Sequence, residues 1–200
     1  MSLGLQSLGL EFSSDDLNKL LRFVELMRRW GRVYNLTAIN EPESIIRLHL
    51  LDSLSIWPHL RSGRILDVGT GAGLPGIPLS VLFPLDQFEL LDCSAKKMRF
   101  VRQAAIELGL ANVRTVQHRI EDYTPLQPFD SIIVRAFGSL ADIWSRTRGL
   151  LNQQGIILAM KGRGTELDLG SLRGADVRVI RLAVPGLEAE RHVVELTPRQ

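Results

Sequence analysis

The first part of the chain carries hydrophobic side chains at helical spacing. Apolar residues recur every three or four positions along one helix face, namely Leu17, Leu20, Leu21, Val24 and Met27. Ser13 or Ser14 fits a helix N-cap, because Asp15 and Asp16 follow in the first turn, where the helix dipole favours acidic groups. The pattern therefore predicts a helix that ends near Gly31.

A second helix is expected between Pro42, which fits a first helical turn, and Pro58 at its end. Its apolar positions are Ile45, Ile46, Leu48, Leu51, Leu54 and Trp57. Residues 1–62 contain no period-two alternation, which would indicate a half-buried strand. These residues predict an N-terminal helical extension that packs on the rest of the chain.

From Gly63 onward, short apolar runs alternate with helical segments. Seven runs are expected to form strands: Arg64–Val68, Phe88–Leu91, Val113–Gln117, Ser131–Val134, Gly155–Met160, Val177–Leu182 and His192–Leu196. Strands that alternate with helices build a mostly parallel sheet with helices on both faces. The last two runs fit a closing pair joined around Pro185 and Gly186. Residues 63–200 therefore predict one α/β domain, without a linker to a further domain.

Composition agrees with a globular chain. With 200 residues, 45% hydrophobic and 23% charged, the chain is long enough to bury a core and too hydrophobic for disorder. No run of about 18 apolar residues predicts a membrane span, and the N-terminus lacks the basic start and long apolar run of a signal peptide. The single cysteine, Cys93, cannot form an internal disulfide, so we expect a cytoplasmic protein without a membrane partner.

A glycine-rich loop follows the first predicted strand. Gly69, Gly71, Gly73 and Gly76 fall within eight residues. Glycines at this place let the backbone turn tightly and approach a ligand, and the next helix offers unpaired N–H groups. A strand-to-helix turn without a ligand is the alternative, but the density of glycines favours a nucleotide-like ligand.

Two acidic residues help to distinguish the possible ligands. The glycines match G-x-G-x-x-G, and Asp92 follows about 20 residues later, as in dinucleotide-binding domains. Asp67, however, lies inside the first strand, where such domains usually have an apolar residue. This carboxylate could bind the ammonium group of S-adenosylmethionine, with Asp92 toward the ribose hydroxyls, or it only caps the following turn. A nicotinamide-dependent oxidoreductase and a non-catalytic cofactor-binding regulator are the alternative functions.

Residues after the third and fourth predicted strands reach the same crevice. Ile120 offers a flat apolar contact for an adenine ring, and Glu121 offers an acceptor for its amino group. An ordinary surface loop is the alternative for this pair. Arg135, at the end of the fourth strand, is a candidate for orienting RNA or cofactor. Alternatively, it forms a structural ion pair with Asp67, Glu121 or Asp130.

Histidine and cysteine do not form a metal-binding pattern. The four histidines are dispersed and there is one cysteine, so no metal is expected. His49 and Asp52 lie three positions apart on the second helix. We interpret them as hydrogen-bonding groups between the helical extension and the sheet rather than as catalytic groups.

Several motifs together resemble the RsmG family, also called glucose-inhibited division protein B. They are Trp30 with Tyr34-Asn35-Leu36-Thr37, His49 through Leu54, Asp67 through Pro78, Lys96-Lys97, Arg119-Ile120-Glu121, Arg135-Ala136 and Lys161-Gly162. The resemblance covers residues 30–162, and more loosely the chain beyond. The combination of Gly73-Leu74-Pro75-Gly76 with Tyr34-Asn35-Leu36-Thr37 is far more specific than a glycine fingerprint.

The resemblance implies a bacterial methyltransferase with the Rossmann-like, seven-stranded sheet of class I S-adenosylmethionine-dependent enzymes. Its product would be N7-methylguanosine at one guanine of 16S ribosomal RNA, so the partner would be this RNA or the small ribosomal subunit. Nothing in the sequence itself demands more than a monomer, which is the state we expect. The resemblance places cofactor contacts at Gly69, Leu74, Ile120, Glu121 and Arg135, with Asp67, Gly71 and Asp92 as further contacts. One departure is Cys93-Ser94-Ala95 before Lys96, where the family often has a glycine.

The implied reaction needs no general base, because N7 of neutral guanine carries a lone pair and no proton. The enzyme would hold the nucleophile and the methyl group in line at about 3–3.5 Å. No residue is therefore assigned as a catalyst, and Arg135 and Lys161 are candidates for orienting the substrate.

The net charge of +2 conceals basic clusters. Residues 94–114 hold five basic side chains against Glu107, and residues 135–163 hold five against Asp142. We predict a phosphate-binding rim whose RNA affinity falls steeply with salt. The RNA-binding candidates are Arg28, Arg29, Arg32, Lys96, Lys97 and Arg163.

Overall fold

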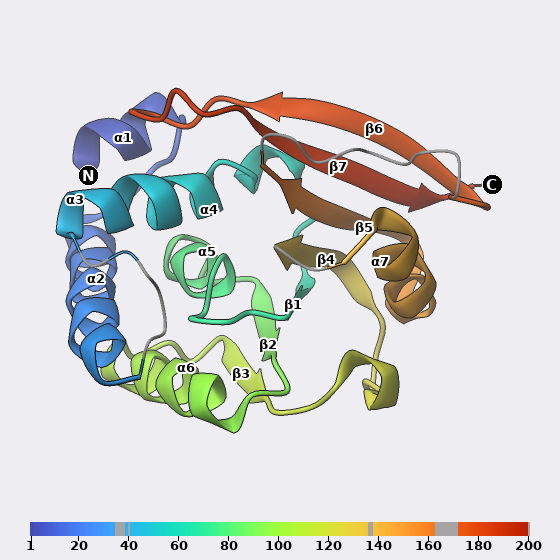
Figure 1. The fold of residues 1–200 in the computed structure, drawn as a ribbon, viewed down its shortest axis with the longest axis horizontal. Helices are drawn as coiled ribbons and strands as arrows, with labels where there is room; N and C mark the ends of the chain where they lie inside the picture. The colour runs from blue at the N-terminus through green and yellow to red at the C-terminus, as the bar shows by residue number, and fades with distance from the viewer. Residues whose placement is uncertain (35–38, 40, 136–137, 163–171, 200) are drawn as a thin grey trace.

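A seven-stranded sheet organises the molecule (Figure 1). The computed structural model describes residues 1–34, 39, 41–135, 138–162 and 172–199, with the backbone alone at 32–34. The strands are β1 (Arg64–Val68), β2 (Gln87–Leu91), β3 (Val113–Val116), β4 (Phe129–Arg135), β5 (Leu151–Lys161), β6 (Ala175–Leu182) and β7 (Arg191–Pro198). Their order is β3-β2-β1-β4-β5-β7-β6, and β7 runs antiparallel to both of its neighbours while the other pairs are parallel. This arrangement confirms the predicted α/β sheet and its closing pair.

Helices cover both faces of the sheet. The α-helices are α1 (Ser2–Ser7), α2 (Ser14–Tyr34), α3 (Pro42–Ile45), α4 (Asp52–Leu54), α5 (Gly76–Leu82), α6 (Ala95–Glu107) and α7 (Leu140–Thr147). A π-helical turn, η1 (Ile46–Leu51), joins α3 to α4, and the 3-10 turns are η2 (Trp57–His59), η3 (Ile120–Asp122) and η4 (Arg148–Leu150). The capping prediction is confirmed, because the Oγ of Ser13 accepts from the backbone N–H of Asp16 at 3.1 Å. The first helix nevertheless continues past Gly31, and α1 is an additional element.

Two hydrophobic cores lie on opposite faces of the sheet. The larger joins Phe23 and Leu54 of the N-terminal helices to Ile65 of β1. The other packs Trp144 of α7 against Leu66 of β1. Side chains alternate along a strand, so neighbouring β1 residues enter different cores. Figure 1 accordingly shows α2, α5 and α6 on one side of the sheet and α7 on the other. The N-terminal helices thus share their core with one sheet face.

The carboxyl ends of β1, β2 and β4 meet at one edge of the sheet. Val68, the last residue of β1, is in register with Leu91 of β2 and Val134 of β4. The chain continues from β1 to β2 on one side and reaches β4 on the other, so the order of strands reverses here. Open α/β sheets bind their ligands at such a switch point. Separately, no helix in the described part of the chain has the length and hydropathy to cross a membrane.

Candidate active site

A cavity opens at the carboxyl ends of the central strands. Its volume of about 290 Å³ lies near the lower end of the roughly 300–1,000 Å³ of small-molecule sites. The lining residues are Val68, Gly69, Leu91, Asp92, Cys93, Lys97, His118, Arg119, Ile120, Glu121, Arg135 and Arg146. The fold therefore brings together five of the predicted cofactor positions, Gly69, Asp92, Ile120, Glu121 and Arg135. Larger hollows of about 730 and 430 Å³ near Pro185 and Gly186 contain none of the predicted residues.

The glycine loop is tied to the end of β2. The backbone N–H groups of Gly69 and Thr70 donate to the carbonyl of Leu91, at 2.8 and 3.1 Å. Gly69 has a φ of 69°, in the left-handed region that glycine adopts without strain. These two bonds fix the start of the glycine loop to the end of β2. Gly69 itself lies in the cavity wall.

Asp67 lies beneath the loop rather than in the cavity. Its side chain is fully buried, and Oδ2 accepts hydrogen bonds from the Thr70 hydroxyl at 2.6 Å and the Gly76 N–H at 2.9 Å. Oδ1 has no hydrogen-bond partner among the described residues. Burial raises the pKa of this carboxyl to about 6, although the bonds from Thr70 and Gly76 lower it. The carboxyl group therefore anchors the loop through Oδ2, as in the alternative interpretation, and the expected contact of Asp67 with the cofactor stays a prediction.

Two further expected contacts, Gly71 and Leu74, also lie outside the cavity wall that the described residues form. Gly71 supports the wall from behind, because its N–H donates to Oδ2 of Asp92 at 3.0 Å. Leu74 is buried in the larger core. Both residues shape the loop in this structure, and their expected contact with the cofactor stays a prediction.

Asp92 faces the cavity at the end of β2. Its Oδ1 accepts from the Ser94 N–H at 2.8 Å, and Nζ of Lys97 lies 3.8 Å from Oδ2. Each carboxylate oxygen has a second lone pair that can accept a hydroxyl hydrogen. Ser94 also caps α6, since its Oγ accepts from the Lys97 N–H at 3.4 Å. The residues that depart from the family pattern, Cys93-Ser94-Ala95, thus still begin an ordinary helix, and the Ser94 N–H holds the Asp92 carboxylate.

Ile120 and Glu121 lie beside the crevice, as the sequence predicts. Ile120 is buried and lines the cavity. Glu121 lies at the rim and forms an ion pair with Arg146 of α7. Sequence reasoning did not place Arg146 at the site, because a contact between η3 and α7 depends on how the helix packs on the sheet.

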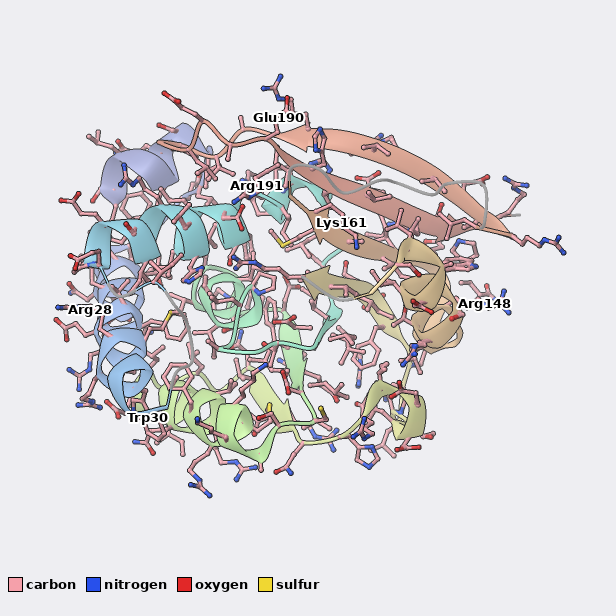
Figure 2. All side chains as sticks on the ribbon, viewed as in Figure 1. Arg28, Trp30, Arg148, Lys161, Glu190 and Arg191 are labelled. Atoms are coloured by element: carbon pink, nitrogen blue, oxygen red, sulfur yellow. The ribbon has the colours of Figure 1, made fainter. Side chains whose placement is uncertain are left out.

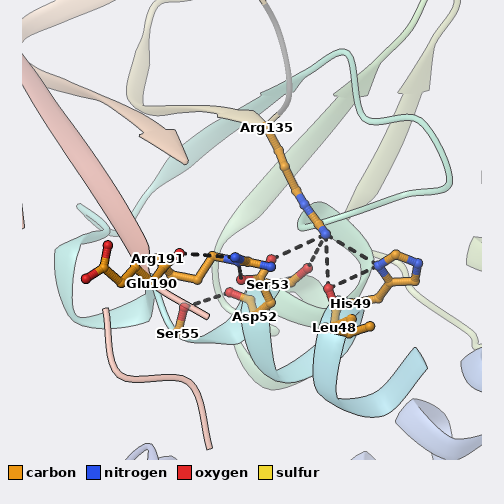
Figure 3. Close-up of polar contacts among 8 residues, drawn as sticks. All are labelled: Leu48, His49, Asp52, Ser53, Ser55, Arg135, Glu190 and Arg191. Carbon is orange, nitrogen blue, oxygen red and sulfur yellow. Dashed lines mark hydrogen bonds and ion pairs between the residues drawn. The ribbon is translucent and has the colours of Figure 1, made fainter. Parts of the chain in front are cut away.

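Arg135 ends β4, and its guanidinium group reaches the helical extension (Figure 3). Its Nη2 lies 3.3 Å from Oδ2 of Asp52. Among the described residues it forms no ion pair with the partners considered from the sequence, Asp67, Glu121 and Asp130, so Asp52 corrects that expectation. Burial lowers the pKa of Arg135, while Asp52 and Asp67 raise it. The predicted role of Asp52 in linking the extension to the sheet is confirmed.

Two predicted RNA-binding residues, Lys96 and Lys97, are exposed at the start of α6. Lys97 also lines the cavity. Lys161, at the end of β5, donates from Nζ to the carbonyl of Gly138 at 2.9 Å, and burial lowers its pKa. These lysines therefore lie close to the strand ends, as the topology predicted.

Figure 2 shows Arg28 on α2, in the helical extension. Arg29 pairs with Glu107 of α6 at 3.1 Å. Arg28 is half-buried, and its Nε has no hydrogen-bond partner among the described residues. The side chain of Arg32, all of Arg163 and the motif positions 35–37 and 136 lie outside the described residues.

The cavity residues fit S-adenosylmethionine. Asp92 offers carboxylate oxygens for ribose hydroxyls, Ile120 offers an apolar surface for adenine, and Arg135 offers a cation for the amino-acid carboxylate. Within the described residues, no group of three or more His, Cys, Asp and Glu side chains is arranged to hold a metal.

Comparisons with known proteins show the family to which the chain is related. The family model described as rRNA small subunit methyltransferase G matches residues 16–194. A protein named ribosomal RNA small subunit methyltransferase G from Methylococcus capsulatus is 57% identical over 196 residues, which are 98% of this chain and 96% of that protein. A protein of the same name from Methylobacillus flagellatus is 44% identical over 197 residues, which are 98% of this chain and 96% of that protein.

A solved structure shares the fold. The SAM-dependent methyltransferase from Thiobacillus denitrificans, in complex with S-adenosyl-L-homocysteine, has a TM-score of 0.57 at 19% identity, covering 84% of this chain and 98% of that one. This likeness confirms the Rossmann-like class I methyltransferase fold. The family model spans most of the chain, and the relatives are 57% and 44% identical. This chain therefore belongs to the GidB family, rRNA small subunit methyltransferase G.

Proposed function

We propose that the protein transfers a methyl group from S-adenosylmethionine to N7 of one guanine in 16S ribosomal RNA. Membership of the family supports small-subunit ribosomal RNA as the substrate class. The resemblance to RsmG supports N7 of guanine as the acceptor. The observation that carries the proposal is the single cavity that collects Asp92, Ile120 and Arg135 at the strand ends.

The cavity residues divide the binding of the cofactor among them. Asp92 would accept hydrogen bonds from the ribose hydroxyls, because its carboxylate is held in place by Gly71 and Ser94. Ile120 would contact the adenine ring, and Glu121 would accept a hydrogen bond from its amino group. The bound cofactor supplies an electrophilic methyl group.

Methyl transfer to N7 places modest demands on the chain's own residues. The guanine lone pair is already free of a proton, so no side chain has to remove one. The protein has to hold the base in line with the methyl group at about 3–3.5 Å, which is catalysis by proximity. Arg135 and Lys161 remain our candidates for orienting the substrate, and the proposal needs neither a metal ion nor a general base.

Basic residues at the cavity support an RNA substrate. Lys97, Arg119 and Arg146 line the cavity, and Lys96 lies next to Lys97 in sequence. Cationic side chains around a cofactor site attract the phosphates that flank a target nucleotide. We propose that the protein works in the cytoplasm as a monomer on the RNA or on the small subunit.

The proposal is tested by mapping the modified nucleotide. Unmodified 16S RNA, free and within the small subunit, is incubated with the protein and S-adenosylmethionine labelled in its methyl group. We expect label at one guanine, detected by nuclease mapping and nucleoside mass spectrometry. The matched control is RNA with 7-deazaguanosine at that position, which lacks the nucleophilic nitrogen. Transfer of label to this control would contradict the N7 assignment, and label in no RNA would contradict the proposed substrate.

A further inference from the structure

A cluster of charges joins the helical extension to two strands of the sheet (Figure 3). Arg135 comes from the end of β4 and Arg191 from the start of β7, while Asp52 begins α4. In the sheet, β4 and β7 are separated by β5. Asp52 therefore connects the extension to strands on both sides of β5.

The partners of Arg135 come from one short segment of the extension. Besides the ion pair with Asp52, Nη1 donates to the Ser53 hydroxyl at 3.2 Å and Nη2 to the Leu48 carbonyl at 3.1 Å. Nη2 also lies 3.4 Å from Nδ1 of His49. These interactions use both terminal nitrogens of the guanidinium group. The extension thus fixes the direction of the guanidinium group of a residue that lines the cavity.

Asp52 supplies the negative charge in this cluster. Its side chain is only 4% exposed, and its two oxygens serve different arginines, with Arg191 Nε at 2.9 Å from Oδ1. Two guanidinium groups would otherwise face each other in a partly buried site, where charges interact more strongly than in water. Removing the carboxylate would leave Arg135 without its ion pair and beside another cation.

We infer that Asp52 is a positioning residue for the methyl donor: it holds Arg135 so that the guanidinium group pairs with the carboxylate of the cofactor's amino-acid moiety. This inference rests on the proposed function for the identity of the cofactor. Guanidinium groups bind carboxylates strongly and with defined geometry. The adenosine part of the cofactor would instead be held by Asp92 and Ile120, which follow β2 and β3, on the other side of β1 from Arg135.

Two probes separate this role from a merely structural one. S-adenosylhomocysteine carries the amino-acid carboxylate, whereas 5′-methylthioadenosine has the same adenosine and thioether without it. We expect Asp52→Asn to raise the Kd for S-adenosylhomocysteine about tenfold, because a buried charge pair is broken. The Kd for methylthioadenosine should stay within about twofold, since it has no partner for Arg135. Calorimetry with the full-length protein measures both constants.

Glu195 provides the matched control. It is also a largely buried acid whose oxygens contact two side chains, with His59 Nδ1 at 2.8 Å and Arg178 Nε at 3.0 Å, but it does not line the cavity. Glu195→Gln should lower thermal stability and leave the Kd values of both probes unchanged. Ser53→Ala, which removes a single hydrogen bond of Arg135, is a milder variant in case Asp52→Asn does not fold.

A double-mutant cycle tests whether Asp52 acts through Arg135. Arg135→Met should weaken S-adenosylhomocysteine selectively, and adding Asp52→Asn should cause no further weakening, because coupled residues are not additive. Equal weakening of both probes by Asp52→Asn, an unchanged Kd for S-adenosylhomocysteine, or additive effects would each overturn the inference. Wild-type protein that binds S-adenosylhomocysteine but methylates no ribosomal RNA would instead refute the proposed function and leave the inference standing.

Discussion

Asp67 has a structural use that its position in the motif does not reveal. The carboxyl group holds the two ends of the glycine loop, through Thr70 and Gly76. A Cβ atom at Gly76 would lie 2.8 Å from Asp67 Oδ2 and 2.1 Å from Leu90 Cδ2, so only glycine fits there without a shift. The motif's first acid and last glycine are therefore one packing unit beneath the loop.

The raised pKa of Asp67 predicts an unusual dependence of stability on pH. The folded state retains the proton up to about pH 6, whereas the ordinary value is 3.8. Because folding favours the protonated form of Asp67, this group's contribution to the free energy of unfolding is fully present below pH 3.8. The contribution is lost as the pH rises through about 6. Asp67→Asn cannot ionise. Between about pH 4 and about pH 7, the unfolding free energy of the wild type should fall relative to this variant by as much as about 3 kcal/mol.

Urea denaturation at both pH values measures this difference. His49 acts in the opposite direction, because burial lowers its pKa to about 4 and its contribution is lost as the pH falls from 6.5. Both proteins contain His49, so its effect cancels in the comparison. Asp176→Asn is the control, since Asp176 is an exposed acid paired with Arg199. An equal difference between wild type and Asp67→Asn at both pH values would refute the prediction.

At the scale of elements, the strands were the most predictable part of the fold. Buried parallel strands such as β1 and β4 are nearly continuous apolar runs, and every run predicted as a strand forms one. The ends were less predictable. The β5 strand begins at Leu151 rather than Gly155, because Leu151 pairs with Phe129 across an irregularity in the β4–β5 register. Pairing of this kind is set by the neighbouring strand and leaves no hydrophobic signal in the polar residues 152–154.

The candidate site was predictable where the order of strands determines it. Gly69, Asp92 and Ile120 follow three successive strands, so a parallel sheet must bring them to one edge. The ion pair between Arg135 and Asp52 could not be derived in this way. It joins residues far apart in sequence, and it depends on how the helical extension packs against the sheet.

Helix α6 is expected to contribute more to RNA binding than α2. Its basic residues begin with Lys96 and Lys97 at the cavity end, and its one acidic residue, Glu107, pairs with Arg22 and Arg29 of α2 at 3.0 and 3.1 Å. We expect the double variant Lys96→Gln and Lys97→Gln to weaken binding of a 16S RNA fragment. The slope of log affinity against log salt should decrease by about 0.7–0.9 for each RNA phosphate that the variant no longer neutralises.

Fluorescence anisotropy between about 50 and 200 mM KCl measures this slope. Arg29→Gln is the comparison, because the charge of Arg29 is already engaged with Glu107, and its effect should be smaller. Lys96→Gln alone should retain affinity for S-adenosylhomocysteine, which separates RNA binding from cofactor binding. Unchanged slopes in the double variant would place the RNA-binding surface elsewhere.

At the scale of the whole molecule, the N-terminal helices behave as part of the domain rather than as an appendage. Trp30 of α2 packs on Phe100 of α6, with ring centroids 5.6 Å apart, and Trp57 stacks on Phe83 at 6.2 Å. The extension also supplies Asp52 to the ion pairs beside the cavity. The apolar faces of its helices are buried in the core that they share with the sheet. We therefore propose that residues 1–62 and residues 63–200 fold as one unit.

One cooperative unfolding transition is the expected consequence, and the tryptophans allow it to be tested. Trp57 reports on the extension, whereas Trp144 reports on α7 at the opposite face of the sheet. In one variant Trp30 and Trp144 are replaced by Phe, and in the other Trp30 and Trp57 are replaced. In each variant, the urea midpoint from fluorescence should coincide with that from far-UV circular dichroism, as two-state unfolding requires. S-adenosylhomocysteine at about 100 times its Kd should stabilise both variants by about 2.7 kcal/mol. A Trp57 fluorescence midpoint at a lower urea concentration than the circular dichroism midpoint would mean that the extension unfolds first. A ligand-induced increase of the midpoint that is seen with Trp144 but not with Trp57 would mean that the extension does not contribute to the cofactor site.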